Sequence, residues 1–391
     1  MTNPLAAPAP ALLPEVFPEV LPYHRMARVS ARHRWWRPVL GTGFVAVACM
    51  LVGGLLYGIG SALGAAWGYP EAPDGTVEFG PVTGTALDLL TIASALPVVL
   101  LAVRWIGRRP AGTVSSVTGR LRWRWLGLCV LATLPVLSVT TGVLLLLPTD
   151  DAPPAHWAGW EVFGPALAML IVLVPLQSAA EEYVFRGWLT QAVGGFLRSP
   201  WWALVPQALL FAAAHGWGTP WGFADLAVFA LVAGWLTVRT GGLEAAIGLH
   251  AVNNLLAFGV SAALVDGLKT DDTAADAPWQ LVAVDLAGIA LYAAAVLWLA
   301  RRRTPTRAVP APAPVPPPWP LPFPTAYPQV PAAYVPVPCV PAPVPAPSVP
   351  VPSVPVPGAE RTDVPDLPRT GNRNPVNRPD HRTNQPDHRT K

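Results

Sequence analysis

Long apolar stretches alternate with short polar connections along most of this chain. Most stretches contain about 20 residues or more, which is enough for an α-helix to cross the hydrocarbon core of a bilayer. The stretches predicted as helices are 38–67, 84–106, 125–148, 163–196, 201–216, 221–239, 243–265 and 278–300. The pattern therefore predicts an all-α fold, a polytopic transmembrane bundle of about eight helices.

The hydrophobic pattern also divides the chain into three parts. A short N-terminal segment, 1–37, precedes the transmembrane domain, 38–303, and a Pro-rich segment, 304–391, follows it. Repeated Val-Pro and Ala-Pro sequences favour polyproline-like structure and exclude helices and central strands. We expect a disordered or extended cytoplasmic tail that acts as a spacer, with docking of a partner to its Pro-rich sequence as the alternative.

Composition agrees with a membrane protein and excludes other classes. The chain is 52% hydrophobic and 13% charged, with a mean hydropathy of +0.40, whereas a soluble domain has about 25% charged residues. A net charge of +3 gives no indication of a nucleic-acid partner. The three cysteines, Cys49, Cys129 and Cys339, lack the CxxC spacing of a thiolate zinc site and are too few for a disulfide framework.

The charges between the apolar stretches predict the orientation in the membrane. Arginine-rich connections alternate with acidic ones: Arg104, Arg108, Arg109, Arg120, Arg122 and Arg124 follow the second stretch, whereas Asp150, Asp151 and Glu161 follow the third. Short loops rich in Lys and Arg stay in the cytoplasm. We therefore expect a multi-pass protein of the cell membrane with both termini cytoplasmic.

The fourth stretch holds charges where a membrane span should have none, namely Glu181, Glu182 and Arg186. Such residues are costly in a bilayer and mark functional sites or buried pairs. Glu182 and Arg186 are four residues apart and can pair, so a purely structural ion pair is an open interpretation for them. Glu181 points about 100° away around the helix and is crowded by a second carboxylate, which favours it as a general base.

Two later stretches each contribute a histidine to this polar set. His215 ends FAAAH, and His250 begins HAVNN, in which Asn254 lies one helical turn further on the same face. His250 and Asn254 either hydrogen-bond between helices as packing contacts or donate hydrogen bonds to a developing oxyanion. Other acids in the stretches have simpler explanations at helix ends and are not assigned to the site: Asp88, Asp225, Asp285 and Glu244.

Read in order, the three motifs resemble those of a known family. EEYVFR at 181–186 fits EExxxR, FAAAH at 211–215 fits FxxxH, and HAVNN at 250–254 fits HxxxN. This set is similar to that of the CPBP intramembrane proteases, the CAAX prenyl protease 2 or ABI family. The resemblance covers about 163–265 and does not extend to the first three predicted helices or the tail.

The resemblance implies an intramembrane endopeptidase that hydrolyses a membrane-associated or hydrophobic, CAAX-type-like peptide. By its analogy Glu181 activates a water that His215 helps to hold, and His250 and Asn254 stabilise the oxyanion. Glu182 and Arg186 orient the site. The expected partners are a peptide or protein substrate in the membrane and the lipid bilayer itself.

The sequence leaves alternatives open for the cofactor and for the class of function. We favour a mechanism without a metal, because the HExxH motif is absent, but Glu181, His215 and His250 are also a ligand set that zinc accepts. A proton-coupled transporter with a relay through Glu181, Glu182, His215 and His250 is a second class, although no internal repeat supports it. A non-catalytic scaffold or immunity-type protein is a third.

One geometric difficulty concerns the fifth stretch. Arg198 should lie near the cytoplasm, and His215 follows it at a distance of roughly 25 Å along a straight helix. His250 is much nearer its own cytoplasmic end. For the two histidines to meet, the fifth helix must tilt, begin deeper or stop short of crossing, and a re-entrant helix would change the orientation of every later loop.

Overall fold

The computed structural model describes residues 19–146, 156–269 and 273–312. The predicted tail lies outside these residues from position 313 onward, as does Cys339, so the expectation of a disordered tail stays a prediction there. The described residues all belong to one compact unit.

Seven helices within the described residues are long and apolar enough to cross a membrane. The prediction of a multi-pass helical bundle is therefore confirmed. Two of the seven are continuous helices built from shorter segments, α2–α3–η2 and α5–η4–α6. The bounds are α1 Trp36–Ala66, α2 Pro81–Ala93, α3 Ala95–Leu101, η2 Ala102–Ile106, α4 Trp123–Leu146, α5 Trp160–Glu182, η4 Tyr183–Leu189, α6 Thr190–Gly194, α8 Pro220–Thr240, α9 Glu244–Ala263 and α10 Trp279–Arg303.

The eighth apolar stretch forms a shorter helix, α7, Trp201–Ala214. Its 14 residues span only about 21 Å, which is less than the hydrocarbon core. The turn after α7 bonds to the connection between α9 and α10, because Thr219 donates from its backbone nitrogen to Ala275 (2.8 Å) and from its hydroxyl to Ala277 (2.7 Å). The predicted order of the later loops relative to the membrane stays a prediction.

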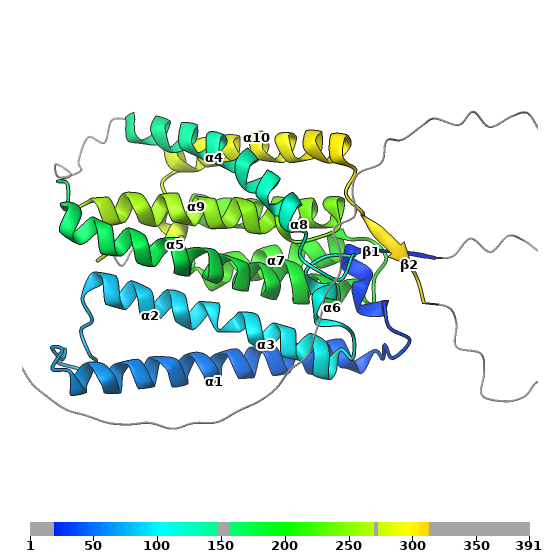
Figure 1. Ribbon diagram of the computed structural model, residues 1–391, viewed down its shortest axis with the longest axis horizontal. Helices are drawn as coiled ribbons and strands as arrows, with labels where there is room; N and C mark the ends of the chain where they lie inside the picture. The colour runs from blue at the N-terminus through cyan, green and yellow to red at the C-terminus, as the bar shows by residue number, and fades with distance from the viewer. Residues whose placement is uncertain (1–18, 147–155, 270–272, 313–391) are drawn as a thin grey trace, which may run out of the picture. The chain divides into compact units, whose positions relative to one another are not determined.

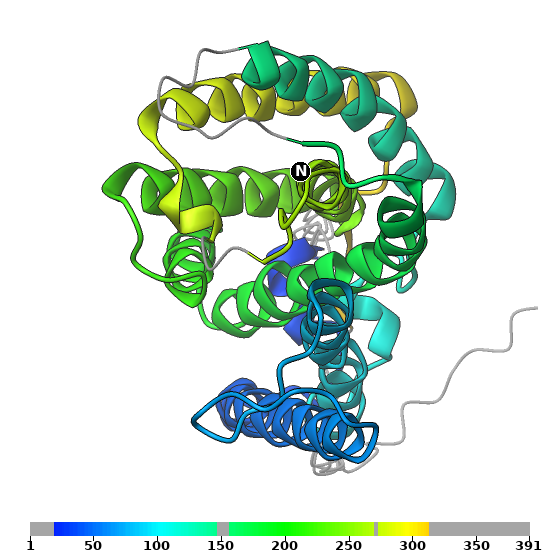
Figure 2. The ribbon, with the colours of Figure 1, turned by 90° about the vertical axis from the view of Figure 1, so that its left-hand side faces the viewer.

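The helices run side by side, and α9 occupies the centre of the bundle (Figures 1 and 2). It packs against α4, α5 and α8, while α1 lies at one flank against α2, α3 and η2. Small residues allow the closest approaches: a Cβ atom at Gly248 of α9 would lie 3.2 Å from Cys129 Cβ of α4. Close packing through small residues is what holds helices together in a bilayer, where the hydrophobic effect between them is weak.

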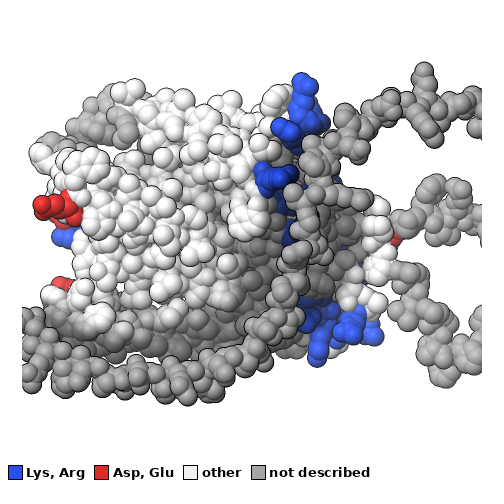
Figure 3. All heavy atoms as spheres, in the orientation of Figure 1, with Lys and Arg blue, Asp and Glu red and all other residues white. Residues whose placement is uncertain are grey.

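The two ends of the bundle carry opposite charge (Figure 3). Arginines end α8 and α10, at Arg239 and Arg301–Arg303. At this end β1 (Val20–Pro22) pairs antiparallel with β2 (Ala308–Pro310), with Val20 opposite Pro310. The chain before α1 and the chain after α10 thus meet at one end of the bundle (Figure 1), as the alternation of the loop charges predicts.

The segment after β1 folds onto the arginine-rich end as the 3-10 helix η1, Tyr23–Arg28. Tyr23 donates its hydroxyl to the Val114 carbonyl (2.5 Å) in the short turn η3, Ala111–Val114. A ring nitrogen of His24 lies 2.9 Å from the carbonyl oxygen of Arg198. A Cβ atom at Gly194 of α6 would collide with the His24 carbonyl, so this contact requires glycine.

Candidate active site

The two glutamates lie at the junction where α5 changes into the π-helical segment η4. Glu181 and Glu182 are the last residues of α5, and Arg186 follows within η4. A π-helical segment inserts an irregular turn into a helix and is common at functional sites. In this chain it directly follows the charged pair, at the level where α5 faces the central helix α9.

Glu182 accepts contacts from two other helical segments on one carboxylate oxygen. Arg186 Nη1 lies 3.2 Å from Glu182 Oε1, and both side chains are fully buried. The predicted Glu182–Arg186 pair is therefore present. The same oxygen accepts a hydrogen bond from His250 Nδ1 of α9 at 2.7 Å. Glu182 thus fixes the orientation of the His250 ring, which spacing within α5 could not reveal.

Arg186 is held mainly by aromatic rings. Its guanidinium carbon lies 4.1 Å from the centre of the Phe211 ring and 5.7 Å from that of Phe229. Its three guanidinium nitrogens have no hydrogen-bond partner in residues 19–146, 156–269 and 273–312, so the approach to Glu182 is an ion contact without hydrogen-bond alignment. A cation over an aromatic face is stabilised by the ring quadrupole, yet its donors remain unsatisfied.

Glu181 faces the other side of the His250 ring. Glu181 Oε2 lies 3.6 Å from His250 Nε2, and the Glu181 side chain is 12% exposed. This separation is too long for a direct hydrogen bond and suits one water molecule that contacts both atoms. Glu181 Oε2 is buried and accepts no hydrogen bond from any of the described residues. The imidazole of His250 therefore stands between two carboxylates from one helix.

A glutamine links Glu181 to Asn254. Gln177 Nε2 donates to Glu181 Oε1 at 2.7 Å, and Asn254 Nδ2 donates to Gln177 Oε1 at 3.3 Å. Ser178 donates its hydroxyl to the same Gln177 oxygen at 3.1 Å. Sequence reasoning missed Gln177, although a buried amide four residues before Glu181, on the same face of an apolar helix, was a readable signal.

His215 lies at the edge of this group. It follows the last residue of α7, and its Nδ1 lies 2.9 Å from the Phe211 carbonyl oxygen one turn earlier. The Phe211 ring contacts both histidines, with centroid distances of 4.6 Å to His215 and 5.8 Å to His250. The two predicted histidines are thus brought to one aromatic ring, and this resolves the difficulty of their depth.

The structure therefore joins five of the six predicted site residues through direct polar contacts or through Gln177. The joined residues are Glu181, Glu182, Arg186, His250 and Asn254. His215 is connected to them through Phe211 alone among the contacts of the described residues.

The sequence left open a metal set of Glu181, His215 and His250. In the described part of the chain, no three His, Cys, Asp or Glu side chains gather as metal ligands would. His250 Nδ1 is bonded to Glu182 and His215 Nδ1 to a backbone carbonyl, so Nε2 is the nitrogen of each ring that could meet another ligand. No catalytic step through a metal is derived from this geometry.

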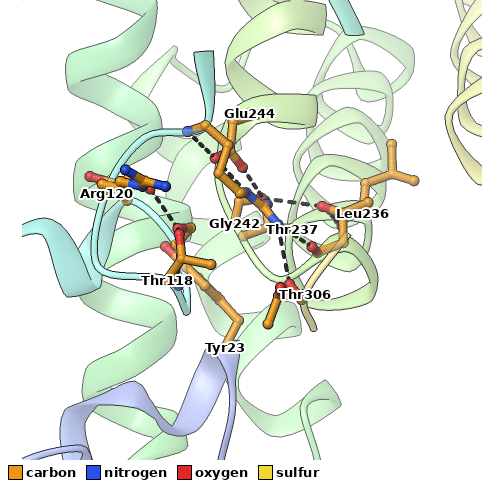
Figure 4. A network of polar contacts seen from close by, with 12 residues as sticks. Tyr23, Thr118, Arg120, Leu236, Thr237, Gly242, Glu244 and Thr306 are labelled. Carbon is orange, nitrogen blue, oxygen red and sulfur yellow. Dashed lines mark hydrogen bonds and ion pairs between the residues drawn. The ribbon is translucent and has the colours of Figure 1, made fainter. Parts of the chain in front are cut away.

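The acids that were not assigned to the site lie elsewhere. Glu244 begins α9 and forms an ion pair with Arg122, with Nη2 and Oε2 2.6 Å apart. Arg122 also donates to the Thr240 and Thr306 carbonyls, each at 3.1 Å, in a polar network at the arginine-rich end (Figure 4). The Asp225 and Asp285 carboxyl groups contact each other between α8 and α10. Neither set contacts the glutamate–histidine group.

Comparison with known proteins tests the family resemblance that the three motifs indicate. Residues 163–256 match the family model described as "Type II CAAX prenyl endopeptidase Rce1-like". The matched residues contain all three motifs and every predicted site residue, so the resemblance to the CPBP family is confirmed.

One curated relative extends the similarity beyond this core. The chain is 29% identical over 188 residues to the uncharacterized protein YyaK of Bacillus subtilis (strain 168). The alignment covers 46% of this chain and 62% of that relative. No solved structure matches the chain.

Proposed function

We propose that this protein is an intramembrane endopeptidase that hydrolyses a hydrophobic or membrane-associated peptide with a water activated by Glu181. The observation that carries the proposal is the position of the buried oxygen Glu181 Oε2, which lies 3.6 Å from His250 Nε2 and has no hydrogen-bond partner among the described residues. The match of residues 163–256 to a family of CAAX prenyl endopeptidases supports the same reaction class.

Glu181 is the general base in this proposal. A water that contacts Glu181 Oε2 gives a proton to that oxygen as its own oxygen attacks the peptide carbonyl carbon. Glu181 later delivers the proton to the leaving nitrogen when the carbon–nitrogen bond breaks. The products are a new carboxyl group and a free amine, and Glu181 ends as it began.

His250 and Asn254 stabilise the oxyanion in the tetrahedral intermediate. Asn254 Nδ2 carries two hydrogens, and one of them is donated in the hydrogen bond to Gln177 Oε1. His250 donates from Nδ1 to Glu182, and with Nε2 also protonated it has a second donor for the oxyanion. Two carboxylates, one guanidinium and one imidazolium then sum to zero net charge, which suits a site inside a membrane.

The substrate side of the proposal follows from the charge of the bundle ends. The arginine-rich end, where β1 and β2 pair, is proposed to face the cytoplasm according to the positive-inside rule. His250 lies two turns into α9 from that end. The scissile bond is accordingly placed in the cytoplasmic half of the bilayer, and the class of peptide is hydrophobic near its cleaved end.

The test is cleavage by the full-length protein in detergent of a panel of lipidated and non-lipidated hydrophobic C-terminal peptides, read by mass spectrometry. We expect wild type to cleave at least one class of peptide and Glu181→Gln to reduce the rate by about 10³-fold or more. A rate unchanged in Glu181→Gln would rule out this mechanism.

A chelator arm tests the metal question directly. Cleavage should be the same after treatment with a chelator that is then removed. If chelation abolished cleavage and zinc alone restored it, the Glu181-only mechanism would be wrong and a metal would have to be included.

A further inference from the structure

Gln177 occupies a place in the site that none of the three motifs includes. It lies on α5 one turn before Glu181, is buried, and contacts side chains from two helices. An amide in an apolar helix is expensive unless its polar atoms are paired. Both of its polar atoms are paired here, and two of its three partners, Glu181 and Asn254, are proposed catalytic residues.

The chemistry of the partners fixes which way the Gln177 amide points. An ionised carboxylate only accepts hydrogen bonds, so the amide nitrogen must face Glu181 Oε1, 2.7 Å away. The amide oxygen is then turned toward donors, namely Asn254 Nδ2 at 3.3 Å and the Ser178 hydroxyl at 3.1 Å. One rigid amide therefore sets the orientation of two further groups.

The two oxygens of Glu181 become unequal as a result. Oε1 accepts a hydrogen bond from Gln177, whereas Oε2 has no such partner in the described part of the chain and faces His250 Nε2 at 3.6 Å. The free oxygen is thus the one directed at the histidine of α9. On the other side, the hydrogen bond from Asn254 turns its amide nitrogen, rather than its oxygen, toward α5.

We infer that Gln177 is a positioning residue, which selects Glu181 Oε2 as the proton-accepting oxygen and presents Asn254 Nδ2 as an oxyanion donor. This inference rests on the proposed function, because it assigns Gln177 to the same reaction. Gln177 itself contacts neither water nor peptide in this role. It couples the base on α5 to the donor on α9.

Two variants and a matched control separate positioning from support of the fold. Gln177→Met keeps the volume and removes both hydrogen bonds. Gln177→Glu keeps the shape and replaces the donor to Glu181 by an acceptor. Gln207→Met is the control, because Gln207 is as deeply buried but donates only to the backbone carbonyls of Leu204 and Ala230.

Steady-state kinetics give the first result. Gln177→Met should lower kcat by about 10²-fold, the effect of a small misplacement of catalytic groups, with KM changed less than about threefold. Gln177→Glu should move the acid limb of the pH–rate profile to higher pH, because a second carboxyl group beside Glu181 disfavours its ionised form. Gln207→Met should leave kcat, KM and the acid limb of the pH–rate profile unchanged.

Infrared spectroscopy gives a result that needs no substrate. The carboxyl C=O band of Glu181, identified by its loss in Glu181→Gln, should titrate at higher pH in Gln177→Glu than in wild type. If wild type cleaves peptides and both Gln177 variants keep the wild-type kcat and acid limb, the inference is wrong and the proposed function stands. If wild type cleaves nothing, the proposed function is wrong. A Glu181 band that is unshifted in Gln177→Glu would then overturn the link between Gln177 and Glu181 as well.

Discussion

Two arginine–glutamate pairs in this protein have buried carboxylates but differ in how completely they are satisfied. Glu244 accepts from Arg122 Nε and its backbone nitrogen at Oε1, each at 2.8 Å, and from Nη2 at Oε2, at 2.6 Å. In the other pair, Glu182 Oε2 and all three guanidinium nitrogens of Arg186 lack hydrogen-bond partners within the part of the chain that the structure describes.

We propose that the difference separates a structural contact from a reactive one. When the polar atoms of an ion pair are all hydrogen-bonded within the protein, none is available to bind a ligand. Such a pair holds neighbouring segments together, as the Arg122 contacts do (Figure 4). A buried group with an unsatisfied atom carries a free-energy cost, and such a cost is typical of sites whose remaining contacts form with substrate, water or the transition state. The comparison therefore favours the Glu181–Glu182–His250 group as the reaction centre.

The largest expected effect on stability comes from the satisfied pair. Glu244→Gln should lower the free energy of unfolding by about 3 kcal/mol, because it leaves Arg122 without its carboxylate. Thermal unfolding in detergent measures this change. Cleavage per folded molecule should stay within about twofold of wild type, and a selective loss of cleavage would break the comparison.

A double substitution sharpens that result. Arg122→Met together with Glu244→Met removes both charges at once and should recover most of the lost stability, since burying a matched apolar pair is often neutral or better. A double variant less stable than Glu244→Gln would show that the contacts of Arg122 with Thr240 and Thr306 matter more than the ion pair.

Asn254→Ala should show the opposite pattern. Loss of one oxyanion donor typically costs about 10²–10³-fold in kcat, or about 3–4 kcal/mol. We expect this fall in kcat with an unfolding midpoint close to that of wild type. Initial rates at saturating peptide measure it, and an unchanged kcat would assign Asn254 to packing between helices.

His215→Ala should have a smaller effect than Asn254→Ala. Among the described residues, His215 is connected to the group through the Phe211 ring alone, so we propose that it contributes only indirectly to holding the water. We expect kcat to fall by about tenfold, or about 1.4 kcal/mol. A loss as large as that of Glu181→Gln would place His215 in direct contact with the reacting atoms.

The smallest expected effect concerns the arginine-rich end and its pH dependence. Burial lowers the pKa of His24, although its bond to the Arg198 carbonyl acts in the opposite direction. The unfolded segment then binds the proton more readily, so the stability from docking η1 is complete above about pH 6.5, the ordinary value for histidine, and falls as the pH drops below it.

Hydrogen exchange of the amides of η1 tests this sign. Protection should be lower at pH 5.5 than at pH 7.5, and His24→Gln should reduce the difference. It should not remove it entirely, because burial also lowers the pKa of His33 nearby. Protection that rises on acidification would contradict the assignment.

The sequence predicted well what depends on local spacing. The apolar stretches became helices, and Glu182 and Arg186 pair because residues four apart share a helix face. The short α7 could not be distinguished from a span, because the apolar stretch continues into the turn that bonds to the α9–α10 connection.

Contacts between distant residues were beyond this kind of prediction. The bond between His250 and Glu182 joins residues 68 positions apart, and the two three-residue strands β1 and β2 pair across nearly the whole described chain. Periodicity shows which face of a helix is polar but not which neighbour it meets. Gln177 is an exception, because its position four residues before Glu181 could be read from the sequence. Its residue type alone did not identify it as a site residue.

The most direct test of the central claim measures Glu181→Gln and Glu244→Gln side by side, with peptide cleavage and thermal midpoint recorded for each. The account predicts that Glu181→Gln loses cleavage by about 10³-fold or more at an unchanged or raised midpoint, and that Glu244→Gln loses stability while keeping its cleavage per folded molecule. Full cleavage by Glu181→Gln would contradict it.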